Sequence, residues 1–228
     1  LNFNFVYLVS GSFTVLVALF CIIFYPQFNS PTIQNKKIIL RRRYWLYYAL
    51  QFMSGARRQI FVVFAGFMMV ERFGFEVHEI TSLFMINLIF NILFAPVVGA
   101  AINKYGERRA LLFEYTGLIV IFFAYGGIYW FGWGVIIASF LYVLDHIFFA
   151  LALALKTYFQ KIADPADIAP TAAVAFTINH IAAVFLPASL GYLWLFSPSS
   201  VFVIAASIAL VSFFLALLIP RHPCLGNE

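Results

Sequence analysis

The sequence has little charge and almost no cysteine. Asp, Glu, Lys and Arg make up only 10% of its 228 residues, while 64% are hydrophobic and 20% are aromatic. Because soluble domains are about half apolar and about a quarter charged, this composition argues against a soluble protein and indicates an integral membrane protein. The two cysteines, Cys21 and Cys224, lie in an apolar run and in the C-terminal tail, which argues against a disulfide framework.

Patterns that mark other classes of membrane protein are also absent. The apolar runs hold no dense His, Asp or Glu spacing for a metal and no Ser–His nucleophile, and no long soluble domain accompanies them. We therefore expect no enzyme, no metal site and no cofactor. The last apolar run, Ser199–Ile219, contains no Lys for a retinal Schiff base, which argues against a rhodopsin. The formal net charge of +5 is interpreted as a topology signal, so we expect no nucleic-acid partner.

Seven apolar runs are present, and a helix needs about 20 apolar residues to cross the hydrocarbon layer of a bilayer. The predicted spans are Phe3–Tyr25, Tyr44–Val70, Val77–Val98, Arg109–Trp130, Trp133–Leu155, Ala169–Trp194 and Ser199–Ile219. This predicts a transmembrane helix in 1–25, a basic linker in 26–43, a six-helix bundle in 44–219 and a tail in 220–228. The segment 156–170 between the fifth and sixth spans is expected to form a surface helix and turn.

The first run is not a signal peptide, because no basic stretch precedes it and no small-residue cleavage site follows it. The chain begins at Leu1 and enters an apolar run at once, so we expect that upstream sequence is missing.

Basic residues gather on one side of the predicted spans. Eleven lie there, against Arg72 alone on the other side. Because cytoplasmic loops carry the excess of Lys and Arg, we expect this side and the C-terminus to face the cytoplasm, in a plasma or cytoplasmic (inner) membrane. The eleven are Lys36, Lys37, Arg41, Arg42, Arg43, Lys104, Arg108, Arg109, Lys156, Lys161 and Arg221.

Two adjacent arginines, Arg57 and Arg58, lie near the middle of the second span. An Arg at the centre of a span costs about 2.5–3.5 kcal/mol, so the pair costs about 5–7 kcal/mol unless it meets water or an anion. Ionisable residues at this depth usually serve a function. We therefore expect these two side chains to bind an anionic solute.

Other polar residues fall at a similar depth in four of the spans. Gln51, Ser54 and Arg58 follow one another at helical spacing and predict a stripe facing inward. The remaining polar residues at this depth are Asn87, Asn91, Asp145, His146, Asn179 and His180. Together they predict a hydrated central cavity, in which Asp145, His146 or His180 would carry a proton.

Structural explanations remain open beside these functional ones. Asp145 would neutralise one arginine as a buried ion pair, whereas Glu114 is expected to lie too near the end of its span to reach the other. One positive charge would then require an anionic ligand or a carboxylate from missing sequence. The asparagines would otherwise bond helices together, and the histidines would make ordinary polar contacts.

The stretch "GAAINKYGERRA" resembles the signature loop of the major facilitator superfamily, Gly-x-x-x-Asp-(Arg/Lys)-x-Gly-(Arg/Lys)-(Arg/Lys). Gly99, Lys104, Gly106 and Arg108 match the pattern, and Arg109 follows it. Asn103 replaces the Asp and Glu107 replaces a basic residue, as in a degraded copy from the second half of such a transporter. The long basic linker after the first span fits helix six followed by the six-helix C-terminal half.

This resemblance implies a secondary transporter that works by alternating access, with Arg57, Arg58, Asp145 and His146 on the helices that line the substrate cavity. It implies the lipid bilayer, a small anionic solute and H+ as partners, with a missing N-terminal half or a second chain to complete the fold. The alternatives are a half-transporter acting as a scaffold or homodimer and a drug-efflux pump of the same fold. A ligand receptor is disfavoured by the signature loop.

Overall fold

The computed structural model describes residues 3–26, 32–35, 37–38 and 40–226. The chain divides into two compact units, Leu1–Ile33 and Gln34–Glu228. The first unit holds one helix, α1 (Phe3–Phe24). Lys36 of the predicted basic linker lies outside the described residues.

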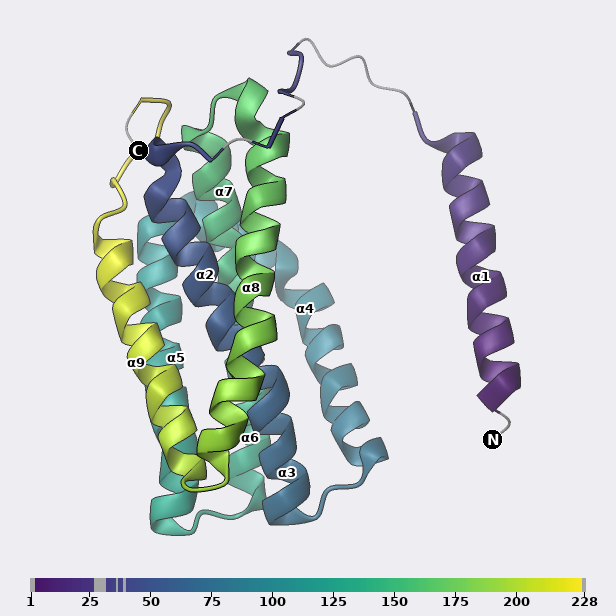
Figure 1. Ribbon diagram of the computed structural model, residues 1–228, viewed down its shortest axis with the longest axis vertical. Helices are drawn as coiled ribbons and strands as arrows, with labels where there is room; N and C mark the ends of the chain where they lie inside the picture. The colour runs from purple at the N-terminus through teal and green to yellow at the C-terminus, as the bar shows by residue number, and fades with distance from the viewer. Residues whose placement is uncertain (1–2, 27–31, 36, 39, 227–228) are drawn as a thin grey trace. The chain divides into compact units, whose positions relative to one another are not determined.

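The second unit is a bundle of helices, and no strand occurs among the described residues (Figure 1). A π-helical turn, Phe61–Ala65, joins the first two of its helices, and a 3-10 turn, Ala150–Ala152, joins α6 to α7. The helices are α2 (Trp45–Ile60), α3 (Gly66–Phe73), α4 (Val77–Tyr105), α5 (Glu107–Phe131), α6 (Val135–Phe149), α7 (Leu153–Ile162), α8 (Ile168–Trp194) and α9 (Pro198–Leu217).

The predicted all-α fold is confirmed, and its helices suit a membrane. Within the described part of the chain, six helices are long and apolar enough to cross a bilayer, with α6 and α7 counted as one. The remaining predicted span, Tyr44–Val70, is not one α-helix, because the π-helical turn divides it into α2 and α3. These features indicate an integral membrane protein.

The break predicted at "NKYGERR" is much shorter than expected. α4 continues to Tyr105 and α5 starts at Glu107, so only Gly106 separates the two helices. Gly106 has φ +84°, a conformation that side chains with a Cβ rarely adopt. A single glycine therefore reverses the chain where a loop was expected. The predicted "GWG" turn is present, and Gly132 ends α5 at φ +68°.

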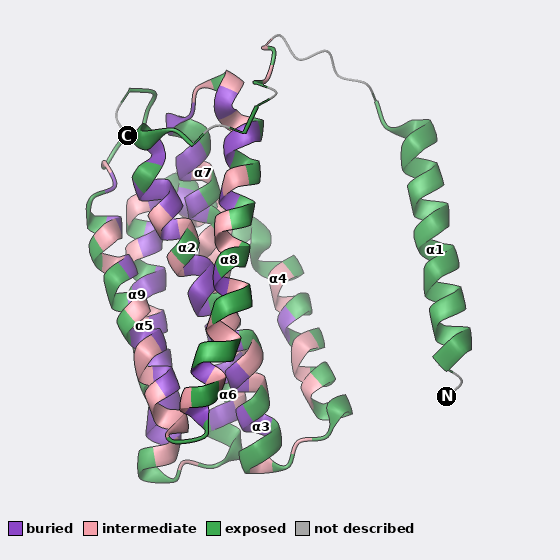
Figure 2. Ribbon diagram, in the orientation of Figure 1, coloured by how far each residue is buried: buried purple, intermediate pink, exposed green. Residues whose placement is uncertain are grey.

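The buried apolar residues of the bundle form two cores, and Figure 2 shows the buried positions in purple along its helices. One core includes Tyr44, Ile102 and Ile219, which belong to the end of the bundle where the linker enters and the chain ends. We call this end the basic end. In the other core, the small residues of α9, such as Ala205 and Ala209, are fully buried and allow close packing against α5.

Helices α2 and α8 touch at backbone level. A Cβ added to Gly55 would collide with the carbonyl oxygen of Asn179 and would lie 3.0 Å from its Cα. The Asn179 Nδ2 donates a hydrogen bond to the backbone oxygen of Gln51 across the same seam, at 3.2 Å. Asn179 therefore fastens two helices together.

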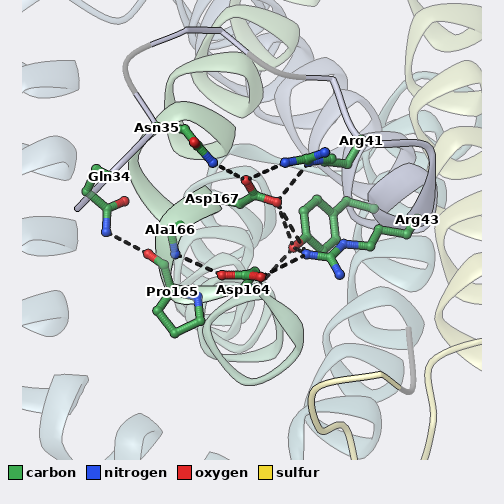
Figure 3. Close-up of polar contacts among 9 residues, drawn as sticks. Gln34, Asn35, Arg41, Arg43, Asp164, Pro165, Ala166 and Asp167 are labelled. Carbon is green, nitrogen blue, oxygen red and sulfur yellow. Dashed lines mark hydrogen bonds and ion pairs between the residues drawn. The ribbon is translucent and has the colours of Figure 1, made fainter. Parts of the chain in front are cut away.

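The linker docks on the turn before α8 through one carboxylate, that of Asp167 (Figure 3). Arg41 binds it with two hydrogen bonds, from Nε to Oδ2 at 2.9 Å and from Nη2 to Oδ1 at 3.1 Å. Asn35 Nδ2 donates to Oδ1 at 2.8 Å, and Arg43 Nη2 donates to Oδ2 at 3.2 Å. The hydrogen bond to Asp167 raises the pKa of the Arg41 guanidinium above its ordinary value. The predicted surface turn is thus an anchor for the linker.

Candidate functional site

A partly open cavity of about 390 Å³ lies between helices of the bundle. It brings together five of the predicted site residues, and residues of α2, α4, α5 and α6 form its walls. The polar lining residues are Arg57, Arg58, Asn91, Asp145 and His146. Aromatic rings from Phe61, Phe84, Phe122 and Phe149 form much of the remaining wall.

Arg57 is paired with an acid that sequence reasoning set aside. Its Nη1 lies 3.5 Å from Oε1 of Glu114, and the two side chains are 1% and 0% exposed. The guanidinium carbon also lies 4.5 Å from the centre of the Tyr115 ring. The expectation that Glu114 lies too near the end of its span to reach an arginine is therefore wrong. Arg57 has a counter-charge and a cation–π contact, both from α5.

Arg58 differs from its neighbour in every one of these respects. Its side chain is exposed and makes no hydrogen bond or ion pair with the residues that the structure describes. It lines the cavity beside Asp145 and His146. The guanidinium that remains available to a ligand is thus that of Arg58.

Asp145 is the second carboxylate of this region and is 2% exposed. Its Oδ1 atom has no hydrogen-bond partner among the described residues, and no ion pair joins the carboxylate to either arginine there. Burying an ionised carboxylate without a partner is unfavourable. Asp145 is therefore a side chain that a proton or a cationic group would stabilise.

His146 follows Asp145 in α6 and contacts α4. Its Nε2 lies 2.7 Å from Nδ2 of Asn91, so an amide that donates there requires a neutral ring with its proton on Nδ1. Asn87, one turn earlier in α4, is 1% exposed, and neither amide atom has a partner among the described residues. Asn91 lines the cavity, whereas Asn87 does not.

The remaining predicted site residues do not line this cavity. Gln51 Nε2 donates to the hydroxyl of Tyr47 at 3.0 Å, and Asn179 holds α2 against α8 as described above. His180 is exposed, and its Nδ1 donates to the carbonyl of Phe176 at 2.8 Å. The sixth predicted span, α8, thus contributes no lining residue to this cavity, and the site roles expected for Asn179 and His180 stay predictions.

Two residues after the arginine pair, α2 ends and the helix changes its winding. The backbone N–H of Phe61 donates to the carbonyls of both Arg57 and Arg58, and the π-helical turn Phe61–Ala65 begins there. Such turns are rare inside helices and are frequent at functional sites. The first two residues of this π-helical turn, Phe61 and Val62, line the cavity.

The residues of the signature-like stretch lie at the basic end. Gly99, Asn103 and Lys104 belong to the last turns of α4, Gly106 is the junction, and Arg108 with Arg109 starts α5. In the described part of the chain, no group of three or more His, Cys, Asp or Glu residues could hold a metal ion.

No protein-family model matches this chain, and no curated protein matches it. The site is therefore interpreted from its own chemistry.

Proposed function

We propose that the chain is the C-terminal half of a secondary transporter of the major facilitator type, which moves a small anionic solute together with a proton. The observation that carries this proposal is the cavity that holds Arg58 and Asp145 within the bundle. A cavity of about 390 Å³ suits a small solute, since ligand sites measure about 300–1,000 Å³.

The charges in and beside the cavity support a coupling between anion and proton. Arg57 and Arg58 bring two positive charges, while Glu114 and Asp145 bring two carboxylates. With both carboxylates ionised the region is formally neutral. When Asp145 binds a proton, one positive charge is left over, and the exposed side chain that carries it is Arg58. An anion then binds more favourably, and by linkage a bound anion favours the proton.

Arg58 would bind the solute directly. A guanidinium binds a carboxylate or phosphate through two parallel hydrogen bonds, which a lysine does not reproduce. The phenylalanine rings of the wall would lower the local dielectric and so strengthen the attraction. Arg57 takes a structural role in this proposal, because Glu114 already neutralises it.

A second helical bundle would form the opposite wall, from another part of the same protein or from another chain. The two bundles would then rock about the site and open it to one side at a time, as inverted or parallel repeats do in such transporters.

The test is uptake into proteoliposomes that contain the chain together with its second bundle, as one longer chain or as two chains. A thermal-shift panel of monocarboxylates, dicarboxylates and inorganic phosphate first selects a bound anion, and its uptake is then measured with and without a pH gradient. We expect Arg58→Gln and Arg58→Lys to lose binding, and Asp145→Asn to keep binding but lose the response to the gradient. Arg42→Gln, a matched change at an exposed arginine outside the cavity, should behave as the wild type.

Normal uptake by Arg58→Lys would contradict the role of the guanidinium. Uptake of apolar cations that ignores Arg58 would favour drug efflux instead, and the absence of transport for every probe would favour a scaffold.

A further inference from the structure

A second and larger cavity, of about 780 Å³, lies at the basic end. The end of α4, the start of α5, the end of α7 and the segment after α9 form its walls. None of its lining residues also lines the cavity around Arg58. The two cavities are therefore separate sites.

The walls of this second cavity are strongly cationic. Lys104, Arg108, Arg109, Lys161 and Arg221 line it, against one carboxylate, that of Glu107, which leaves a net formal charge of +4.

The carboxylate of Glu107 already has a partner within the protein. Glu107 is 2% exposed, and one of its oxygens forms an ion pair with Lys161. The other four cations form no ion pair with the described residues, although Lys104 lies over the ring of Tyr105. Four cations thus face one space without a counter-ion from the described chain. An anion that enters it relieves their mutual repulsion.

We propose that this cavity binds a phosphate group, carried by the headgroup of an anionic lipid or by a soluble phosphate compound. Two consecutive arginines, Arg108 and Arg109, offer planar guanidinium groups that match phosphate oxygens in pairs. Lys104 and Arg221 add positive charge from two other segments. Basic pockets between helix ends at a membrane face are places where phosphate headgroups bind.

Thermal unfolding of the purified chain tests the site and identifies the source of the phosphate. One arm compares nanodiscs of phosphatidylglycerol with nanodiscs of phosphatidylcholine, and the other adds inorganic phosphate to the protein in detergent. A higher midpoint in phosphatidylglycerol alone supports a lipid headgroup. A higher midpoint with inorganic phosphate supports a soluble ligand at the same site.

Variants connect the effect to the cavity. Loss of a charged hydrogen bond weakens binding by about tenfold or more, so Arg108→Gln with Arg109→Gln should remove most of the shift. Arg221→Gln, in an exposed segment after α9, should reduce the shift without affecting the helices. Arg42→Gln serves as the control, because Arg42 is exposed and lies outside the cavity. The proposal is overturned when neither probe shifts the midpoint, or when the cavity variants respond as the control does.

Discussion

The buried pair of Arg57 and Glu114 gives the sharpest test of the structure. Both side chains are at most 1% exposed, so neither charge can turn to water when its partner is removed. Breaking a buried ion pair by removing one partner costs about 3–5 kcal/mol, whereas replacing both with apolar side chains is often neutral. We expect Arg57→Met and Glu114→Gln each to destabilise by that amount, and Arg57→Met with Glu114→Leu to cost less than either.

The assay is thermal unfolding in detergent, followed by tryptophan fluorescence. For a domain of 150–250 residues, each kcal/mol shifts the midpoint by about 2–4 °C, so the single variants should melt about 6–20 °C lower. The neighbouring Arg58→Gln is the matched control, because it removes the same charge from an exposed side chain. We expect it to melt close to the wild type. The pairing would be refuted if the Arg57 and Arg58 variants lowered the melting midpoint equally. It would also be refuted if the double variant lowered the midpoint by the sum of the two single decreases.

Three further predictions concern two contacts between helices and the docking of the linker. Gly55→Ala should destabilise by about 1–3 kcal/mol, since its methyl group meets the backbone of α8, whereas Gly66→Ala, which meets no atom, should be neutral or stabilise by about 0.5–1 kcal/mol. Asp167→Asn should speed tryptic cleavage of the linker at neutral pH, because the docked arginines lose their ionised partner; unchanged cleavage would contradict the docking. Asn91→Leu and His146→Phe should show a coupling of about 0.6 kcal/mol, and at most about 1.7 kcal/mol, in a double-mutant cycle of unfolding; strictly additive effects would argue against their contact.

The helices could be predicted well from the sequence, but their junctions could not. A long apolar run predicts a helical span, because every backbone polar group in hydrocarbon must form its hydrogen bond within the protein. This reasoning located α4, α5, α8 and α9. The junction at Gly106 was expected to be a loop because polar residues surround it. In the structure those residues continue the helices, and one glycine with φ +84° makes the turn.

The polar site could be predicted in part. Arg57, Arg58, Asp145 and His146 stood out because ionisable residues are rare inside spans. Glu114 lies nearer the end of its predicted span than the arginines do, so depth measured from predicted helix ends indicates no contact with them. In the structure, Arg57 lies 12 residues after the start of α2 at Trp45, and Glu114 lies seven residues after the start of α5 at Glu107. The difference of about five residues corresponds to about 7.5 Å at 1.5 Å per residue. An arginine side chain spans most of that distance, and helical side chains point back toward the N-terminus of their helix. Position along a span alone therefore misses contacts between charged side chains whose backbones lie at different depths.

Nothing in the sequence distinguishes the role of Asn179 from that of Asn91. Both are central asparagines, yet Asn179 bonds to the backbone of α2 whereas Asn91 faces the cavity. The difference depends on the rotation of each helix about its axis. The glycine opposite Asn179, Gly55, is the only local signal, and its meaning appears once the helix that contacts it is known.

The contact between α2 and α8 has a mechanical consequence. The two helices are tied near mid-length by Gly55 and Asn179, and again at the basic end, where Asp167 holds the linker that leads into α2. We therefore expect these two ties, at different heights, to resist sliding and twisting between the helices. A wider cavity would then require α4, α5 or α6 to move relative to this pair.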